Sequence, residues 1–263
     1  MGFQGIASKG IVVTGAARGI GAAAARRLAA ERARTLIVDV DAAELEQVAG
    51  ELDGCRAFAA DTSTEDGVAG YMLAAKEHLG RIDGVFLNAG VGGDIALIAD
   101  YDMAAFDRLI SINLRGTFLG MRAAIRQMVD DQTAGSIVAT ASVLAAQGSQ
   151  YFAPYMASKH AIMGLVRSAA LEVGHHGIRV NAICPGYVAT RLVDRAESFA
   201  SGDDDGTAAR EAFQAGVPLG RYSMPEEQAS LATWLLSDES GYATGGGFPL
   251  DGGIGAGPYS RSG

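Results

Sequence analysis

The chain has 263 residues, with 30 acidic and 21 basic side chains and a formal net charge of −9. This length suits one large α/β domain, and the acidic excess argues against nucleic acid as a partner, because phosphate binding requires clustered Lys and Arg. Hydrophobic residues make up 49% of the chain, but no apolar run reaches the ~18 residues of a membrane span and no secretory signal is evident, so we expect a cytoplasmic protein with no membrane partner.

The first informative feature is a glycine-rich turn between a strand and a helix. Residues 11–14 are a β-branched run typical of a buried strand, and the Ala-rich residues 22–32 are typical of a helix. Between them stands Gly15-Ala-Ala-Arg-Gly19-Ile-Gly21. Such glycines allow a tight turn and close backbone approach to a diphosphate, whose charge the start of the helix stabilises. A plain glycine turn is the alternative, but the correct flanks on both sides favour nucleotide binding.

The next strand predicts which cofactor is bound. Residues 35–38 are apolar and end at Asp39, whose carboxylate can accept hydrogen bonds from both adenosine ribose hydroxyls. It would also repel a 2′-phosphate, which carries about −1.5 to −2 charges. Arg18 favours the opposite choice, because a guanidinium beside the turn could hold that phosphate. We expect NAD to be preferred over NADP, because Asp39 would lie directly against the ribose.

Strands and helices alternate along the rest of the chain. This pattern predicts a doubly wound, mostly parallel sheet in a single α/β domain over residues 1–263, with its ligand at the carboxyl ends of the strands. Cys55 and Cys184 lie far apart without metal-ligand spacing, so we expect buried thiols and no metal site. The further strands are expected at 56–60, 84–88, 136–141, 179–184 and 247–250, and the helices at 42–52, 66–79, 104–130, 155–173 and 225–236.

One long polar insertion, residues 191–220, interrupts the alternation. A segment of this kind is either a disordered loop or a mobile lid, and its place after a strand end favours a lid over substrate. Its aspartates at 203–205 are expected to be a solvated acidic tip rather than a cation site. Residues 255–263 are expected to be a flexible tail.

Tyr155 and Lys159 are the strongest catalytic candidates. At positions i and i+4 of a helix, the phenol and the ammonium would face one pocket. A nearby positive charge favours the phenolate and would lower the pKa of Tyr155, which makes a tyrosine usable as an acid or base. Taken alone, this spacing is more common in an amphipathic surface pair.

Several separated motifs together give the chain a family resemblance. They are Thr14-Gly15-x-x-x-Gly19-x-Gly21, Asn88-Ala89-Gly90, Asn113, Ser142, Tyr155-x-x-x-Lys159 and Pro185-Gly186. From about residue 8 to residue 254 the chain resembles the short-chain dehydrogenases/reductases. The resemblance implies a seven-stranded Rossmann-type sheet in the order 3-2-1-4-5-6-7 and assembly as a homotetramer, through the helices at 104–130 and 155–173 and the C-terminal strand.

The resemblance also extends the expected NAD site beyond the glycine turn. It implies that Asp61 contacts adenine with Thr62 beside it, and that Tyr155 and Lys159 contact the nicotinamide ribose. Pro185, Gly186, Val188 and Thr190 would hold the carboxamide and diphosphate side. The complete predicted set is Gly15, Arg18, Gly19, Ile20, Gly21, Asp39, Val40, Asp61, Thr62, Asn88, Ala89, Gly90, Tyr155, Lys159, Pro185, Gly186, Val188 and Thr190.

The expected catalytic residues are Ser142, Tyr155, Lys159 and Asn113. In oxidation, the Tyr155 phenolate would take the hydroxyl proton of a secondary alcohol while hydride leaves for NAD, and Ser142 would donate a hydrogen bond to the same oxygen. Asn113 resembles the family asparagine that holds a water in the proton relay. For Ser142 and Asn113, capping or helix-bonding roles are the alternatives.

Substrate identity is read from residues 92–94, 143–151 and Tyr187. These stretches hold no Arg or Lys, which an anionic substrate such as an acyl-carrier thioester would usually need. We expect a neutral, partly hydrophobic or cyclic alcohol or ketone, with contacts from Ser142, Leu144, Gln150, Tyr155 and Tyr187. Gln150 and Asp94 would equally suit a sugar or polyol, and the apolar residues are almost as well explained by core packing.

Two other function classes are open but disfavoured. A regulatory protein that binds NAD at an idle site is at odds with the intact Ser142, Tyr155 and Lys159. A sugar-nucleotide epimerase or dehydratase generally adds a sizeable C-terminal domain, for which 263 residues leave little room.

Overall fold

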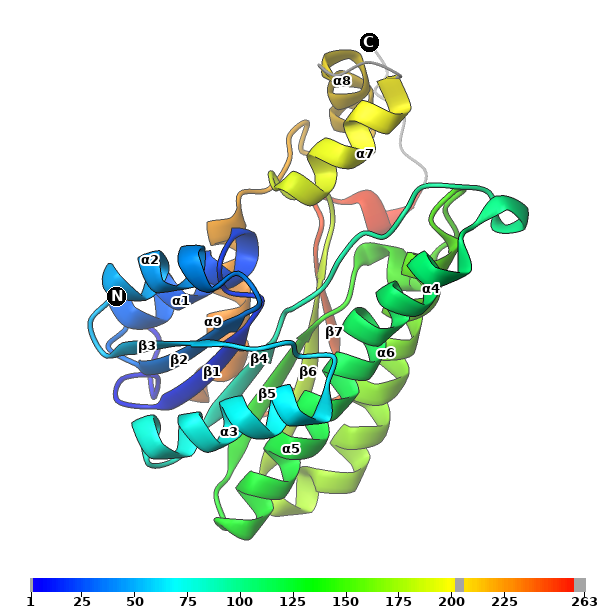
Figure 1. Ribbon diagram of the computed structural model, residues 1–263. Helices are drawn as coiled ribbons and strands as arrows, with labels where there is room; N and C mark the ends of the chain where they lie inside the picture. Colours follow the sequence, from blue (N-terminus) through cyan, green and yellow to red (C-terminus); the bar gives the residue numbers. More distant parts are fainter. Residues whose placement is uncertain (1, 202–205, 258–263) are drawn as a thin grey trace.

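Seven parallel strands form the single sheet of the computed structural model, which describes residues 2–201 and 206–257 (Figure 1). The strand order is β3-β2-β1-β4-β5-β6-β7, which confirms the predicted doubly wound, seven-stranded sheet. The predicted acidic tip at 203–205 and the end of the predicted tail, 258–263, lie outside the described residues. The strands are β1 (Gly10–Thr14), β2 (Arg34–Asp39), β3 (Cys55–Ala59), β4 (Gly84–Leu87), β5 (Gly135–Thr140), β6 (Ile178–Pro185) and β7 (Gly247–Leu250).

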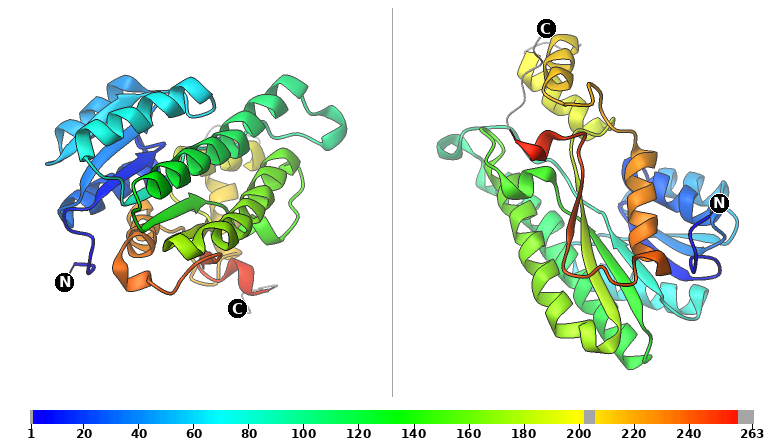
Figure 2. Two further views of the ribbon diagram at one scale, coloured as in Figure 1. Left: turned by 90° about the horizontal axis from the view of Figure 1, so that it is seen from below. Right: turned by 180° about the vertical axis from the view of Figure 1, so that it is seen from behind.

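Each central strand is buried on both faces, because its alternate side chains enter different apolar layers. In β1, Ile11 and Val13 pack into the layer that contains α1 (Gly19–Ala30) and α9 (Pro225–Leu236). Val12 points the other way, into the layer formed with α3 (Glu65–Leu79), α5 (Thr117–Asp130) and α6 (Ala153–Val173). Figure 2 shows the two helical layers on opposite sides of the sheet. The short α2 (Ala42–Gly50) adds Leu45 and Val48 to the first layer.

The helix predicted over residues 104–130 is present along its whole length, but it contains a π-helical turn that the sequence does not predict. It consists of α4 (Met103–Ile110), a π-helical turn at Ser111–Gly116 and α5. π-helical turns are rare and often occur at functional sites. Here the wide turn carries Asn113, which is fully buried.

The polar insertion folds into two short helices, α7 (Arg191–Ser201) and α8 (Thr207–Ala215). They project beyond the carboxyl ends of the strands (Figure 1). Nε of Arg210 in α8 lies 3.2 Å from a carboxylate oxygen of Glu197 in α7, and the Glu197 side chain is only 6% exposed. This ion pair links the two helices.

Two further observations concern the chain as a whole. Both cysteines are free thiols; Cys184 is buried, whereas Cys55 is only partly buried. Within residues 2–201 and 206–257, no helix has both the length and the apolar character needed to cross a bilayer.

Candidate active site

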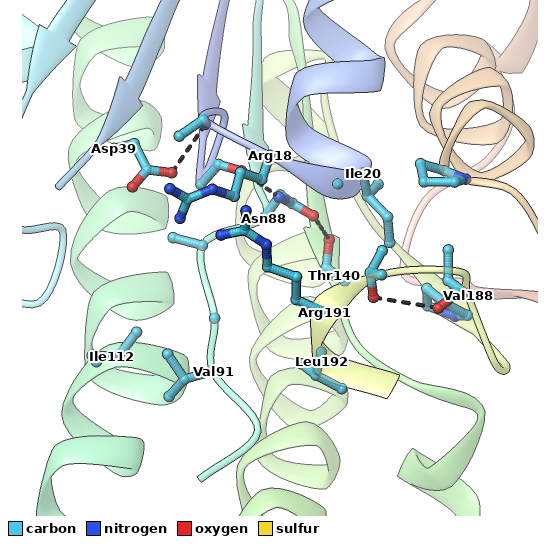
Figure 3. Close-up of a pocket in the computed structure, with 18 of the residues that line it drawn as sticks. Arg18, Ile20, Asp39, Asn88, Val91, Ile112, Thr140, Val188, Arg191 and Leu192 are labelled. Atoms are coloured by element: carbon cyan, nitrogen blue, oxygen red, sulfur yellow. Dashed lines mark hydrogen bonds between the residues drawn. The ribbon is translucent and has the colours of Figure 1, made fainter. Parts of the chain in front are cut away.

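A cleft of about 1100 Å³ opens at the carboxyl ends of the strands (Figure 3). Its walls come from residues at or just after the ends of β1 to β6, from the start of α1 and from the first residues of α7. Open α/β sheets bind their ligands in this place, because the loops there diverge to helices on opposite faces of the sheet.

The glycine turn forms the part of the cleft next to α1. Gly15 and Gly19 have φ values of +65° and +54°, a region that favours glycine. A Cβ on Gly15 would lie 2.7 Å from Cα of Ala89, and one on Gly21 would lie 2.1 Å from the carbonyl oxygen of Gly15. The turn can therefore be built only with glycine, and it leaves the amides at the start of α1 facing the cleft. This geometry fits the diphosphate of a dinucleotide.

The carboxylate of Asp39 is fixed at the end of β2. Its Oδ2 accepts a hydrogen bond from the Ala17 amide at 3.0 Å and its Oδ1 accepts one from the Asp41 amide at 3.1 Å. Arg18 is held nearby by two other carboxylates: its Nη2 lies 2.6 Å from Oδ2 of Asp41, and its Nε pairs with Glu44. The guanidinium that could have received a 2′-phosphate is therefore already neutralised.

Asn88 connects three strands at the floor of the cleft. Its side-chain amide donates to the carbonyl oxygens of Thr14 and Gly15, at 3.2 and 3.1 Å. Its Oδ1 accepts a hydrogen bond of 3.0 Å from Oγ1 of Thr140. Asn88 therefore holds the glycine turn in place, which explains why a polar side chain follows the buried β4.

Tyr155 and Lys159 project from the first half of α6 on the cleft side. The ammonium of Lys159 is 5.6 Å from the centre of the Tyr155 ring, and it donates a hydrogen bond of 2.7 Å to the carbonyl of Thr140 at the end of β5. Ser142 follows β5 and precedes a short 3-10 turn, Val143–Ala146, whose Leu144 amide donates to the Ser142 hydroxyl at 3.1 Å. These three predicted catalytic side chains line the cleft, whereas the fourth, Asn113, does not.

Burial dominates the electrostatics of this pair. It raises the pKa of the Tyr155 phenol, and a hydrogen bond with the Ser142 side chain acts in the opposite direction. It also lowers the pKa of Lys159 to about 8, because a low-dielectric surrounding disfavours the charged form of either group. The net direction for Tyr155 corrects the expectation that Lys159 leaves this pKa below its usual value. Ser142, rather than Lys159, is the side chain whose contact acts to lower it.

Asn113 connects the π-helical turn to the cleft wall. Its side chain exchanges two hydrogen bonds with the backbone of Val91, at 2.8 and 2.9 Å, and also donates to Oγ of Ser158 at 3.3 Å. Ser158 in turn donates to the carbonyl of Tyr155 at 2.7 Å. Asn113 therefore positions Val91, which lines the cleft, and connects it to α6. A water relay through Asn113 stays a prediction.

Comparison with known proteins agrees with this geometry. Residues 15–255 match the sequence model of a family described as enoyl-(acyl carrier protein) reductase. Levodione reductase of Leifsonia aquatica is 38% identical over 250 residues, covering 92% of each chain.

The chain belongs to the short-chain dehydrogenase/reductase family.

Further relatives agree in sequence and in structure. A 2,5-dichloro-2,5-cyclohexadiene-1,4-diol dehydrogenase of Sphingobium indicum is 37% identical and covers 95% of this chain and 98% of its own. The crystal structure of levodione reductase superposes with a TM-score of 0.92 at 37% identity, over 95% of this chain and 98% of that one. A 3-ketoacyl-(acyl-carrier-protein) reductase from Brucella melitensis, solved in complex with NADH, gives 0.87 at 30% identity, over 95% and 99%.

In this short-chain dehydrogenase/reductase, the structure brings together most of the residues predicted for the cofactor. All of them line the cleft except Gly21, which is buried beneath the turn. The predicted substrate contacts are placed differently. Leu144, Gln150 and Tyr187 are not part of the cleft lining, and Tyr187 stacks on Phe213 of α8 with ring centres 5.2 Å apart.

Several cleft residues are not predicted by the sequence, among them Val91, Ile112, Arg191 and Leu192. Val91 and Ile112 directly follow or precede predicted site residues, so their positions were available as a signal. Arg191 and Leu192 directly follow Thr190, but in the sequence they belong to the polar insertion. Their place at the start of α7 is what brings them to the cleft.

Proposed function

We propose that this protein interconverts a secondary alcohol and a ketone with NAD as the hydride carrier. The observation that carries the proposal is the meeting of Ser142, Tyr155 and Lys159 in the same cleft as a glycine turn shaped for a diphosphate. A site with only the turn would suit any nucleotide, whereas the phenol, hydroxyl and ammonium add the means to move a proton.

The roles of the protein groups follow from their positions. In oxidation, Tyr155 accepts the hydroxyl proton of the alcohol, and Ser142 donates a hydrogen bond that stabilises charge on the substrate oxygen. Lys159 is buried in the same wall of the cleft, with its ammonium 5.6 Å from the centre of the Tyr155 ring, and the family resemblance gives it contact with the nicotinamide ribose. A bound nicotinamide supplies the acceptor for hydride from the carbinol carbon.

NAD is the proposed cofactor because the ribose end of the cleft is acidic. Asp39 lines the cleft, and Asp41 and Glu44 both pair with Arg18. Three carboxylates against one guanidinium leave a net negative charge where a 2′-phosphate would bring about −1.5 to −2 more. The ribose hydroxyls of NAD carry no charge and can donate to Asp39.

We propose a neutral, partly hydrophobic or cyclic substrate. Apolar Val91, Ile112 and Leu192 line the cleft together with the catalytic residues. One relative is by name a dehydrogenase of a cyclohexadienediol, which supports a ring-shaped alcohol. A sugar or polyol, or an acyl thioester, is the alternative substrate within the same family.

We also propose a cytoplasmic homotetramer. Phe118 on α5 is 48% exposed and Leu171 on α6 is 87% exposed, and a second copy that covers these helices would remove both side chains from water. Sedimentation of a monomer at micromolar concentration would rule the assembly out.

Replacement of Tyr155 by Phe tests the proposed function. Wild type should form NADH from members of a panel of neutral cyclic and acyclic secondary alcohols. Y155F should lose about 10²- to 10⁴-fold in kcat, the usual contribution of general acid–base catalysis, while calorimetry shows NAD binding within a few-fold. Y242F removes the same hydroxyl from a fully exposed ring and should leave turnover unchanged. A protein that binds NAD but oxidises no alcohol would instead be a regulatory binder.

A further inference from the structure

Arg191 is the first residue of α7 and extends into the cleft. In Figure 3 its side chain runs toward Asn88, while the next residue, Leu192, points away from it. Both line the cleft. Consecutive residues of a helix project about 100° apart, so one turn of α7 presents a cation to the dinucleotide side of the cleft and an apolar group to a different part of its wall.

The ion pairs of the cleft leave Arg191 without a carboxylate partner. Arg18 pairs with Asp41 and Glu44, and the guanidinium of Arg210 lies near both Glu197 and Asp194. Within residues 2–201 and 206–257, by contrast, no carboxylate lies within 4.0 Å of the Arg191 guanidinium, and the same holds for Arg108 on α4. Arg191 is thus a cation whose charge is available to a ligand.

The ligand best suited to this charge is a diphosphate. The chain has a net charge of −9, and acidic Asp39 and Asp61 line the same cleft. A doubly charged group that enters it is repelled unless a cation compensates. The glycine turn offers amides and a helix dipole, which supply only partial charges. A guanidinium adds a full charge and paired donors that match phosphate oxygens.

We propose that Arg191 binds the diphosphate of the dinucleotide and thereby fixes α7 over the substrate side of the cleft. This inference rests on the proposed function, since it assumes a dinucleotide in the cleft. Leu192 links the two effects: the Cβ that Gly92 lacks would lie 3.5 Å from Cγ of Leu192, so an anchored α7 sets the distance between this leucine and the facing loop. Cofactor binding therefore fixes the position of Leu192 in the part of the cleft wall that faces the substrate.

Binding of cofactor fragments tests the electrostatic part of the proposal. Calorimetry would compare ADP-ribose with adenosine for wild type, R191Q and R195Q. Arg195 lies on the same helix but outside the cleft lining, so R195Q makes an equal change of charge without the contact. R191Q should bind ADP-ribose about 10- to 100-fold more weakly, as expected for loss of a charge-assisted hydrogen bond, while adenosine binding and R195Q should be unchanged. R191K should retain an intermediate affinity.

Hydrogen exchange tests the conformational part. ADP-ribose should slow amide exchange across residues 191–201 in wild type and in R195Q, whereas adenosine should not. In R191Q this protection should be lost even at saturating ADP-ribose. Protection of α7 that survives in saturated R191Q would overturn the role of Arg191 as an anchor.

The outcomes separate this inference from the proposed function. If wild type binds no ADP-ribose, the dinucleotide site itself is wrong. If wild type and R191Q bind ADP-ribose equally, the site stands and the role of Arg191 is wrong. If R191Q leaves ADP-ribose affinity intact but raises KM for an alcohol substrate, Arg191 serves the substrate, which also overturns the inference.

Discussion

The ammonium of Lys159 lies 5.6 Å from the centre of the Tyr155 ring, one helical turn away, and is bonded to the carbonyl of Thr140 at 2.7 Å. That carbonyl fixes the ammonium on the wall of the cleft and cannot itself take a proton. Both groups are shifted toward their neutral forms by burial. The protein alone therefore holds the two side chains in position, and they can act only when a substrate and a cofactor are bound.

The Ser142 hydroxyl should set the pH at which oxidation becomes fast. Its hydrogen bond acts to lower the pKa of Tyr155, so in S142A that pKa rises. Oxidation requires the phenolate, and we expect the rise of kcat/KM with pH to move to higher pH in S142A, besides a loss of maximal rate. Reduction, which requires the phenol, should persist to higher pH. S149A is the control on the same segment, and a shift to lower pH in S142A would contradict the assignment.

The buried ammonium of Lys159 should lower the free energy of unfolding of the protein. Its pKa falls from 10.5 to about 8 in the folded state, so the unfolded chain binds more protons between these values and stability rises with pH there. Below pH 8 the full penalty applies, about 3 kcal/mol at 1.36 kcal/mol per unit. K159M also loses a hydrogen bond worth about 1 kcal/mol. We expect it to be about 2 kcal/mol more stable at pH 7, and inactive.

Urea unfolding at pH 7 and near pH 10 would measure this effect. The advantage of K159M should shrink at the higher pH. K76M removes a half-exposed ammonium that pairs with Asp131 and should be neutral or slightly destabilising. A K159M protein less stable than wild type at pH 7 would contradict the burial argument.

The pairs that hold Arg18 should help to exclude NADP. In a D41N/E44Q double variant the guanidinium is released beside the ribose site, and Asn at position 41 can still cap α2 as Asp41 does. We expect binding of 2′,5′-ADP to improve about tenfold, a change of 1.4 kcal/mol, and to improve further when Asp39 is also replaced by Ser.

E46Q is the matched control for that series, because it neutralises an exposed carboxylate on the same helix. Affinity for 5′-ADP should change little in all variants. If E46Q improved 2′,5′-ADP binding as much as D41N/E44Q, general charge and not the release of Arg18 would be the cause.

Arg210 should stabilise the two helices of the insertion. R210M leaves the carboxylate of Glu197, 6% exposed, without its ion-pair partner. Because Arg210 is itself about half exposed, we expect a moderate local cost of about 1–2 kcal/mol. Amide exchange in residues 191–201 and 207–215 should quicken while global unfolding stays near wild type. R221M, which breaks an exposed pair with Glu227, should leave those residues unchanged; equal exchange in R210M would show that other contacts hold the helices.

The sequence predicted those features that depend on local constraints. Gly15 and Gly19 need positive φ angles wherever the fold places them, and Tyr155 and Lys159 share a helix. Features that depend on contacts between distant segments were not predictable in this way. The partners of Arg18 come from α2, and nothing local to Arg18 reveals them.

Two further differences have a similar cause. The apolar pattern of residues 104–130 continues through Asn113, because one wide turn hardly alters helical periodicity. The polarity of the insertion hides its helices, although Val193 and Glu197 of α7 are buried. Both helices are amphipathic, but isolated helices of about ten residues are marginal in water, so docking decides whether they form.

The π-helical turn at Ser111–Gly116 holds one residue more than an α-helical turn. This extra residue sets the direction in which the Asn113 side chain points. Deleting a single position there would let the chain wind evenly from Met103 to Asp130, and intrinsic helicity would gain. The Asn113 side chain would then rotate by roughly 100° about the helix axis, and its hydrogen bonds with the backbone of Val91 would be lost. A more regular helix in this segment would therefore remove the support of the cleft wall at Val91.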